Sequence, residues 1–410
     1  MPHPSPLRQT ALPSRTLVLA DDPAIVAAAR MASRAVGDAA PLLVASGREA
    51  LRHLFRAENR PSRLICQPST AGACWPALMA TARDPFAPTG LVLVREKRRP
   101  RQGMADLISV PPEVEALAEA LRTLPAWPPQ MPIDDPRELA LGLARGEIAV
   151  RYQPVLRIAD RRPVLLEGLA RWQRRDDTPL SPDLFVPLAE RHGLSRALAQ
   201  SVALVAFTEM APRAARLGGQ LSLNLPLELM LEPATLGWLR SLLASTRFPP
   251  RALVLELTET SPVRDRAALR RALHHFRAAG HAVLIDDMSL DEDRSALLEL
   301  PFAGIKLDRH LVAAMPGSRR ARALVQRLVA RAHSRRMTVT AEGVSSAALW
   351  RAAALAGVDQ AQGYAISRPL PAPALPAWTA AHSLPRGIVS RGAGPHGARA
   401  HRPHSRAGTA

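Results

Sequence analysis

Lysine is almost absent from this sequence of 410 residues: Lys97 and Lys306 are the only two. The formal net charge is nevertheless +18. Arginine supplies the charge, spread over the whole chain with many alanines and prolines, as a GC-rich coding sequence would give. Clustered cations bind phosphate backbones, but no zinc-finger spacing, basic-helix run or aromatic-rich RNA motif accompanies them. The charge therefore does not favour a nucleic-acid partner, and it would suit an anionic nucleotide substrate equally well.

Cysteine and long apolar runs are also scarce. Cys66 and Cys74 are the only cysteines, which argues against a disulfide framework and fits a reducing cytoplasm. No run of about 18 apolar residues predicts a membrane span, and residues 1–15 lack the apolar core of a signal peptide. The apolar content of 47% still allows a sizeable core, so the chain can form two domains or a large barrel with an accessory domain.

Strand-like and helix-like segments alternate along residues 16–124. The segment "TLVLADD" predicts a strand that ends at Asp21 and Asp22, and "PAIVAAARMASRA" predicts the helix that follows. Alternation of this kind predicts a doubly wound parallel sheet. We expect four parts: an α/β domain over 1–124, a Pro-rich linker over 125–136, a second domain over 137–382 and a basic disordered tail over 383–410.

In the second domain, successive apolar runs each end in one conspicuous polar residue. These residues are Glu167, Asn224, Glu256, Asp286 with Asp287, Lys306, Glu342 and Gln362. Segments with helical periodicity, such as "DRAALRRALHHFRAAG" and "RRARALVQRLVARAHSR", fill the gaps. Repeated strand–helix units of about 30 residues predict a (β/α)₈ barrel, whose active site lies at the carboxyl ends of its strands.

Convergence of these acids at one end of a barrel predicts a metal site. Carboxylates from different strands would repel one another at close range without a cation. Oxygen ligands of this kind favour Mg²⁺ or Mn²⁺, and two ions about 4 Å apart would clamp an in-line attack on a phosphodiester. A solvated loop explains any one acid taken alone, but chance explains a whole series at strand ends poorly.

Lys306 stands at one of these strand ends in a chain that otherwise uses arginine. An ammonium is a compact charge that can orient or deprotonate a water, whereas a guanidinium stays charged and offers a rigid fork. The alternative is a drifted surface cation, and the strand-end position favours the first interpretation.

The polar series resembles the EAL-domain family of cyclic di-GMP phosphodiesterases. In order, from about residue 140 to 378, the matching residues are Glu167-Gly-Leu-Ala-Arg171-Trp172, Asn224, Glu256-Leu-Thr-Glu259, Asp286-Asp287, Lys306-Leu-Asp308, Ala341-Glu342-Gly-Val and Gln362-Gly-Tyr-Ala-Ile-Ser-Arg-Pro369. The resemblance implies a barrel that hydrolyses cyclic di-GMP to linear pGpG with two Mg²⁺ or Mn²⁺ ions. It also implies a homodimer through this domain.

The resemblance also implies a role for each matching position. Metal binding falls to Glu167, Asn224, Glu256, Asp286 and Asp287, with Asp286 bridging both ions. Glu342 would hold a metal-linked water, and Lys306 would orient or activate the attacking water. The ligand would be gripped by Gln153, Arg171 and Gln362, with Arg171 at a phosphate. Glu259 would brace the loop after the Asp pair.

That loop departs from the family pattern. The family has Gly, Thr and Ser there, whereas this chain has "MSLDEDRSA" from Met288. Without a glycine, any turn that needs a positive φ is strained. The added acidic residues would repel an anionic ligand. Two functions follow: a slow or regulated phosphodiesterase, or a catalytically inactive cyclic di-GMP receptor or protein-binding scaffold. A nucleic-acid-binding regulator rests on charge alone.

The first domain resembles a response-regulator receiver domain in its order of elements and in Asp21 and Asp22. Gln67 stands where that family has the phosphoacceptor Asp, and Val110 precedes Pro111 where that family has Lys. An amide cannot accept a phosphoryl group as a carboxylate does. The resemblance therefore implies a pseudo-receiver that contacts a protein partner.

Overall fold

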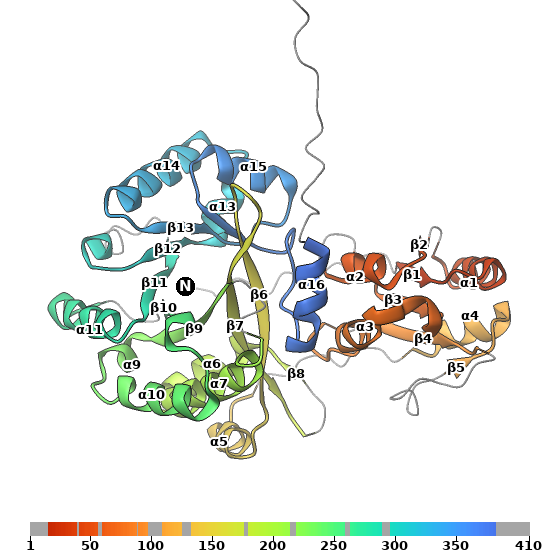
Figure 1. Ribbon diagram of the computed structural model, residues 1–410, viewed down its shortest axis with the longest axis horizontal. Coiled ribbons are helices and arrows are strands. Elements are labelled where there is room, and N and C mark those ends of the chain that lie inside the picture. Colours follow the sequence, from red (N-terminus) through yellow and green to blue (C-terminus); the bar gives the residue numbers. More distant parts are fainter. Residues whose placement is uncertain are drawn as a thin grey trace, which may run out of the picture.

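The structure is a computed structural model, and it describes residues 15–38, 41–55, 60–87, 89–96, 109–124, 133–175, 179–213, 219–258, 263–288 and 296–382. Most of the expected linker and the whole expected tail lie outside these residues. Two α/β units are present, as predicted (Figure 1). Within the described residues, none of the helices is both long and apolar enough to cross a membrane.

The first unit is a five-stranded parallel sheet with the strand order β2-β1-β3-β4-β5. Its elements are β1 (Thr16–Leu19), α1 (Pro23–Ala35), β2 (Leu42–Val44), α2 (Gly47–Phe55), β3 (Arg63–Cys66), η1 (Pro68–Cys74), α3 (Trp75–Ala82), β4 (Gly90–Val94), β5 (Ser109–Val110) and α4 (Val114–Arg122). This is a doubly wound order, so the predicted fold class of the unit is confirmed.

Helices cover both faces of this sheet. Leu17 and Leu19 pack in one apolar cluster with residues of α2 and α3, whereas Val18 packs in another with residues of α1 and α4. Successive residues of a strand point to opposite faces, so a strand buried on both faces has to be continuously apolar. That requirement explains the uninterrupted apolar run from Leu17 to Ala20.

The second unit is a closed barrel of eight strands, with β8 paired to the outer end of β7. The strands are β6 (Ile148–Arg157), β7 (Pro163–Gln173), β8 (Pro179–Leu180), β9 (Gln220–Pro226), β10 (Leu253–Thr258), β11 (Ala282–Met288), β12 (Gly304–Leu307), β13 (Thr338–Ala341) and β14 (Gln360–Gln362). The predicted barrel is confirmed, with one addition: β6 runs antiparallel to both of its neighbours. Only residues 158–162 join β6 to β7, which is too short for the crossover that parallel neighbours need.

Helices alternate with the barrel strands and surround them (Figure 1). They are α5 (Pro136–Ala144), α6 (Pro182–Arg191), α7 (Ser195–Met210), α9 (Leu227–Leu231), α10 (Thr235–Thr246), η2 (Pro250–Ala252), α11 (Arg266–Ala278), η3 (Ala296–Glu299), α13 (Arg309–Ala314), α14 (Arg319–Ser334), α15 (Ala347–Leu355), η4 (Ala372–Ala374) and α16 (Leu375–His382). Several begin at a side-chain cap: Asp265, Ser318 and Ser346 each accept a hydrogen bond from a backbone N–H of the first turn.

Candidate active site

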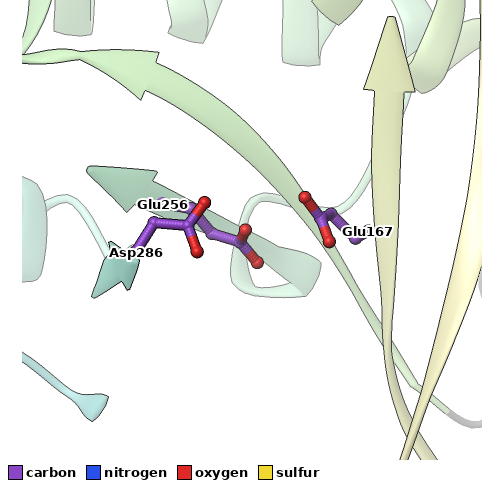
Figure 2. Close-up of side chains that lie close together, drawn as sticks. All are labelled: Glu167, Glu256 and Asp286. Atoms are coloured by element: carbon purple, nitrogen blue, oxygen red, sulfur yellow. The ribbon is translucent and has the colours of Figure 1, made fainter. Parts of the chain in front are cut away.

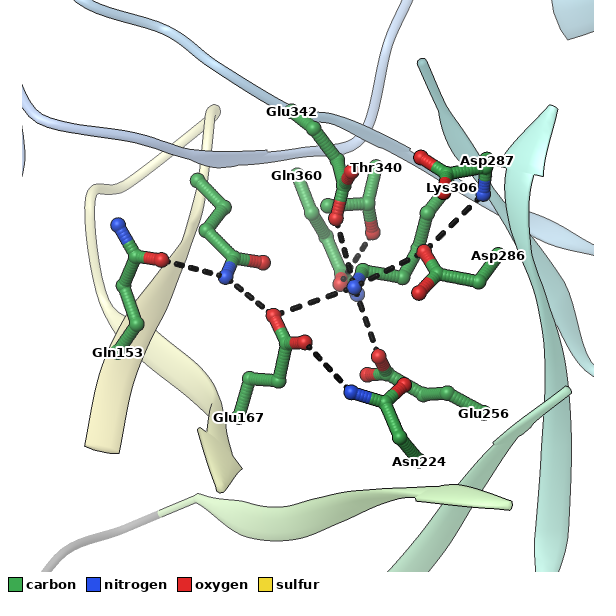
Figure 3. A network of polar contacts seen from close by, with 11 residues as sticks. Gln153, Glu167, Asn224, Glu256, Asp286, Asp287, Lys306, Thr340, Glu342 and Gln360 are labelled. Atoms are coloured by element: carbon green, nitrogen blue, oxygen red, sulfur yellow. Dashed lines mark hydrogen bonds and ion pairs between the residues drawn. The ribbon is translucent and has the colours of Figure 1, made fainter. Parts of the chain in front are cut away.

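The polar series predicted from the sequence meets at the carboxyl ends of the parallel strands (Figure 3). Strand pairing sets this arrangement, since Asn224 of β9 lies opposite Glu256 of β10 and Gln153 of β6 lies opposite Glu167 of β7. Figure 2 shows the carboxylates of Glu167, Glu256 and Asp286 turned toward one another. Residues more than 100 positions apart therefore form one cluster.

Lys306 lies at the centre of this cluster and is 1% exposed. Its Nζ atom lies 2.6 Å from Oε1 of Glu342, 2.7 Å from Oε2 of Glu256, 3.1 Å from Oδ1 of Asp286 and 3.2 Å from Oε2 of Glu167. One ammonium thus faces four carboxylates, and three further positive charges would be needed to balance them if all four were ionised. The interpretation of Lys306 as a drifted surface cation is wrong.

Burial and the charge pattern set the titration of the cluster. Burial alone would lower the pKa of Lys306, but the surrounding carboxylates raise it well above its usual value. Burial raises the pKa of Glu256 to about 8, against the effect of Lys306 and with the help of Glu167 and Asp286. Burial would also raise the pKa of Glu167, but Lys306 and hydrogen bonds from Gln362 and Asn224 lower it. The pKa values of Asp286 and Glu342 are raised as well, mainly by burial, so the single ammonium does not suffice to keep all four carboxylates ionised.

The donor atoms fit divalent ions that prefer oxygen ligands. Oδ1 of Asn224 and Oε1 of Glu256 are buried, and neither accepts a hydrogen bond within the described part of the chain. Buried oxygens without a donor are costly unless a cation contacts them. Two carboxylate groups can each converge on one point: Glu167 with Glu256 and Asp286, and Asp286 with Asp287 and Glu342. Asp286 belongs to both groups, so it is the residue that two ions would share.

A β-bulge presents the Asp pair. The pairing of β11 with β12 shifts register between Ile285 and Met288, and Asp287 has φ 52°. A bulge next to a functional site re-aims side chains, and a left-handed residue other than glycine marks local strain. Here Asp286 stays buried and Asp287 is exposed, so one strand delivers two adjacent carboxylates to the same site.

Amide side chains hold the opposite side of the cluster. Nε2 of Gln362 donates to Oε1 of Gln153 at 3.0 Å and also to Glu167, and Nε2 of Gln153 donates to the carbonyl of Ser367 at 3.0 Å. Asn224 donates to Oε1 of Glu167 at 3.3 Å. These bonds fix the Glu167 carboxylate in the orientation it needs toward Lys306.

Two residues beneath the cluster, the buried Thr340 and the half-buried Gln360, were not predicted. Thr340 pairs in register with Lys306, and its Oγ1 donates to Oε1 of Gln360 at 3.1 Å. The period-two pattern could have indicated both, since Thr340 precedes Glu342 by two residues and Gln360 precedes Gln362 by two. Asp308, which belongs to the matching motif, caps α13 by accepting from the N–H groups of His310 and Leu311.

Some of the predicted residues lie away from the cluster or outside the described residues. Arg171 lies on β7 four residues beyond Glu167 and is half-buried. Glu259 and residues 289–295 of the departing loop lie outside the described residues. The expectation of a decayed loop therefore stays a prediction.

Fold and site together define an α/β-barrel protein with a carboxylate-rich candidate metal site at the strand ends. The chain belongs to the EAL domain family, whose family model matches residues 137–369.

Relatives share this domain rather than their whole length with the chain. An uncharacterized signaling protein of Caulobacter vibrioides is 33% identical over 248 residues, which cover 60% of this chain and 30% of that protein. A cyclic di-GMP phosphodiesterase of Pseudomonas aeruginosa is 30% identical over 233 residues, which cover 56% of this chain and 40% of that protein. A second relative from Pseudomonas aeruginosa is also named a cyclic di-GMP phosphodiesterase, which is a hydrolase, and one from Escherichia coli is named a probable cyclic di-GMP phosphodiesterase.

A solved structure of the PaMucR phosphodiesterase in complex with c-di-GMP is similar to the barrel. The TM-score is 0.53 at 26% identity, and the match covers 57% of this chain and 96% of that one. The barrel of this chain thus corresponds to nearly all of that phosphodiesterase domain.

Proposed function

We propose that this chain hydrolyses one phosphodiester bond of cyclic di-GMP to give linear pGpG, using Mg²⁺ or Mn²⁺. The observation that carries the proposal is the cluster of four carboxylates around Lys306, beside an Asn224 oxygen that accepts no hydrogen bond among the residues that the structure describes. Such a set suits a cation and an anionic phosphodiester together better than it suits a structural core.

The proposal divides the metal ligands between two ions, which share Asp286. Glu167, Asn224, Glu256 and Asp286 would hold one ion, and Asp286 with Asp287 would hold the other. Mg²⁺ or Mn²⁺, when bound, would polarise the phosphoryl oxygens as a Lewis acid and lower the pKa of a nearby water. A divalent ion beside these carboxylates would favour their ionised form, which burial alone disfavours.

Lys306 and Glu342 would handle the water that attacks phosphorus. The side chain of Glu342 is 18% exposed, more than those of the other three carboxylates at Lys306, so solvent can reach it. Nζ of Lys306 would orient the water by donating to its oxygen, while Glu342 would accept one of its hydrogens. Gln153 and Gln362 would contact the ligand, and Arg171 would receive a phosphate.

A catalytically inactive receptor or scaffold is the second candidate. The sequence "MSLDEDRSA" favours it, because this loop lacks the glycine of the family and adds acids beside an anion site. In this alternative the same barrel would bind cyclic di-GMP, or a protein partner, without turnover.

The first domain would act as a contact domain for a protein partner. Supporting this proposal, Gln67 fills the position after β3, where its Oε1 accepts from the N–H groups of Asp21 and Asp22 at 3.2 and 3.3 Å. An amide held in this way cannot be a phosphoacceptor. Pairing of two barrels as a homodimer, and a place in the reducing cytoplasm, complete the proposal.

Chromatography after incubation with cyclic di-GMP and Mn²⁺ tests the proposed activity. We expect pGpG from the wild type, none from Glu167→Ala, and wild-type amounts from Glu299→Ala. Glu299 is an exposed acid that pairs with Arg331 and Arg335 far from the cluster, so its variant controls for the loss of a carboxylate. Binding of cyclic di-GMP without any pGpG would support the receptor instead.

A further inference from the structure

The first domain packs against the ligand-binding side of the barrel. Helices α2 and α3 contact η4 and α16, and Figure 1 shows α16 lying between the two units. The N–H of Arg368 donates to the carbonyl of Phe55 in α2 at 3.1 Å. Next to Arg368, the carbonyl of Ser367 accepts from Gln153, one of the predicted ligand-binding residues. The first domain thus contacts Arg368, and the residue before it in sequence, Ser367, holds Gln153 of the candidate site.

A buried ion pair joins the two domains directly. Oδ1 of Asp84, which follows α3, accepts from Nε and Nη2 of Arg151 at 3.0 and 2.8 Å. The two side chains are 2% and 12% exposed. Nη1 of Arg151 donates to the carbonyl of Val150 at 3.0 Å, and the guanidinium lies 4.9 Å from the ring centroid of Phe86. All three nitrogens of this guanidinium are therefore engaged.

Arg151 lies beside Arg171 at the mouth of the barrel, which is the end formed by the carboxyl ends of the parallel strands. It precedes Gln153 by two residues on β6, so the two side chains share one face of the strand. In the ladder with β7, Arg151 lies opposite Leu169 and Ala149 lies opposite Arg171. The two arginines are consequently diagonal neighbours on that face.

Asp84 stabilises this pair of cations. Burial lowers the pKa of Arg171 and the charge of Arg151 lowers it further, whereas Tyr364, Asp84 and Glu167 act in the opposite direction. A buried charge without counter-charges is costly, so removing Asp84 would weaken the stabilisation of the two arginines. The first domain thereby supplies a charge that the mouth of the barrel needs.

We propose that Asp84 is a positioning residue for the ligand-binding mouth, which makes the candidate site a composite of both domains. This inference rests on the proposed function, since it concerns the same nucleotide ligand. Asp84 fixes Arg151 and thereby the wall that carries Arg171, so a phosphate of the ligand meets a preorganised cation. Asp84 itself contacts none of the reacting atoms.

The test is a double-mutant cycle with Asp84→Ala, Arg151→Ala and both together. Calorimetry gives the Kd for cyclic di-GMP, and steady-state assays give KM and kcat. We expect each single variant to raise Kd and KM about tenfold with kcat nearly unchanged, as a coupling energy of ordinary size would give. The double variant should be no worse than either single one, because both remove the same pair.

Asp160→Ala is the matched control. It removes an exposed pair, 3.1 Å from Arg157, at the other end of β6, and should leave Kd and KM at wild-type values. Asp84→Asn keeps the size of the side chain if the alanine variant fails to fold, and it should give an intermediate rise. Wild-type Kd and KM in Asp84→Ala, or an undiminished effect of Asp84→Ala in the Arg151→Ala background, would overturn the proposal.

Failure of the proposed function would be recognisable separately. A wild type that binds cyclic di-GMP without hydrolysing it refutes the activity, while the Kd values still test Asp84. If the wild type binds no cyclic di-GMP, amide hydrogen exchange of residues 149–153 still tests the role of Asp84. These amides should lose protection in Asp84→Ala but not in Asp160→Ala. Unchanged exchange would then reject the role of Asp84.

Discussion

Lys306 shows at the scale of single residues what could and could not be predicted. Its strand-end position in a chain rich in arginine predicted a functional cation. Its contact with four carboxylates at once could not be predicted, because distances depend on how strands stagger around the closed barrel. The Asp84–Arg151 pair lay even further from prediction, since it joins residues 67 positions apart in two domains.

Replacing Lys306 by alanine should make folding depend on metal. The change leaves four carboxylates, three of them buried, without their ammonium, so the free energy of unfolding in chelator should fall by about 3–5 kcal/mol. Ions that bind the folded state replace the lost charge. Added Mn²⁺ should therefore raise the Tm of the variant more than that of the wild type, as measured by circular dichroism. An equal rise in both proteins would contradict this charge balance.

Replacing Asp287 by glycine should raise the stability of the protein and lower its activity. Its φ of 52° suits glycine, so Asp287→Gly should raise the free energy of unfolding by about 0.5–1 kcal/mol. Turnover should nevertheless fall, because the carboxylate is lost from the second metal group. Arg247→Gly is the control, since Arg247 has φ 57° at the end of α10, far from the site. It should gain stability and keep wild-type turnover, and an equal loss of turnover in both would argue against a ligand role for Asp287.

At the scale of elements, the periodicity of the sequence predicted the helix bounds well, but it did not predict the geometry of the strands. The helix at Pro23–Ala35 has the predicted bounds, and α14 ends one residue before its predicted limit. The bulge in β11 and the reversed direction of β6 escaped prediction. A bulge depends on the partner strand and a strand direction on the neighbours across the sheet, and a single sequence carries neither directly.

Gly363 should be indispensable for the end of β14. Its φ is 152°, and an added Cβ would come within 2.3 Å of the Val344 nitrogen and 2.4 Å of the Val344 oxygen. Backbone cannot move aside cheaply, so Gly363→Ala should lower the free energy of unfolding by about 1–3 kcal/mol and displace Gln362. Denaturant titration measures the first effect and a higher Kd for cyclic di-GMP the second. Gly237→Ala, in open space within α10, should destabilise nothing; equal behaviour of the two variants would refute the clash.

At the scale of the whole molecule, the two domains share one apolar cluster, which includes Leu54 of α2 and Trp378 of α16. Composition and alternation predicted both domains. Their docking could not be predicted, because the apolar face of α2 would equally suit a core within its own domain.

Leu54→Ala should therefore weaken both domains together. Truncating a fully buried leucine costs about 2–5 kcal/mol, and unfolding should remain one transition by tryptophan fluorescence and circular dichroism. KM should rise as well, because looser docking releases the Asp84–Arg151 pair. Leu117→Ala in α4, a buried leucine on the face of the sheet away from the barrel, should cost similar stability without raising KM. Two separate transitions in the wild type would contradict a shared core.

The most direct test of the account is the initial rate of pGpG release by protein stripped with a chelator, before and after addition of Mn²⁺. If the carboxylates around Lys306 form the metal site of a cyclic di-GMP phosphodiesterase, the stripped protein should release no pGpG and Mn²⁺ should restore release. The same addition should restore nothing in Glu256→Gln. Release that is independent of metal, or absent with Mn²⁺ although the protein binds cyclic di-GMP, would contradict the account.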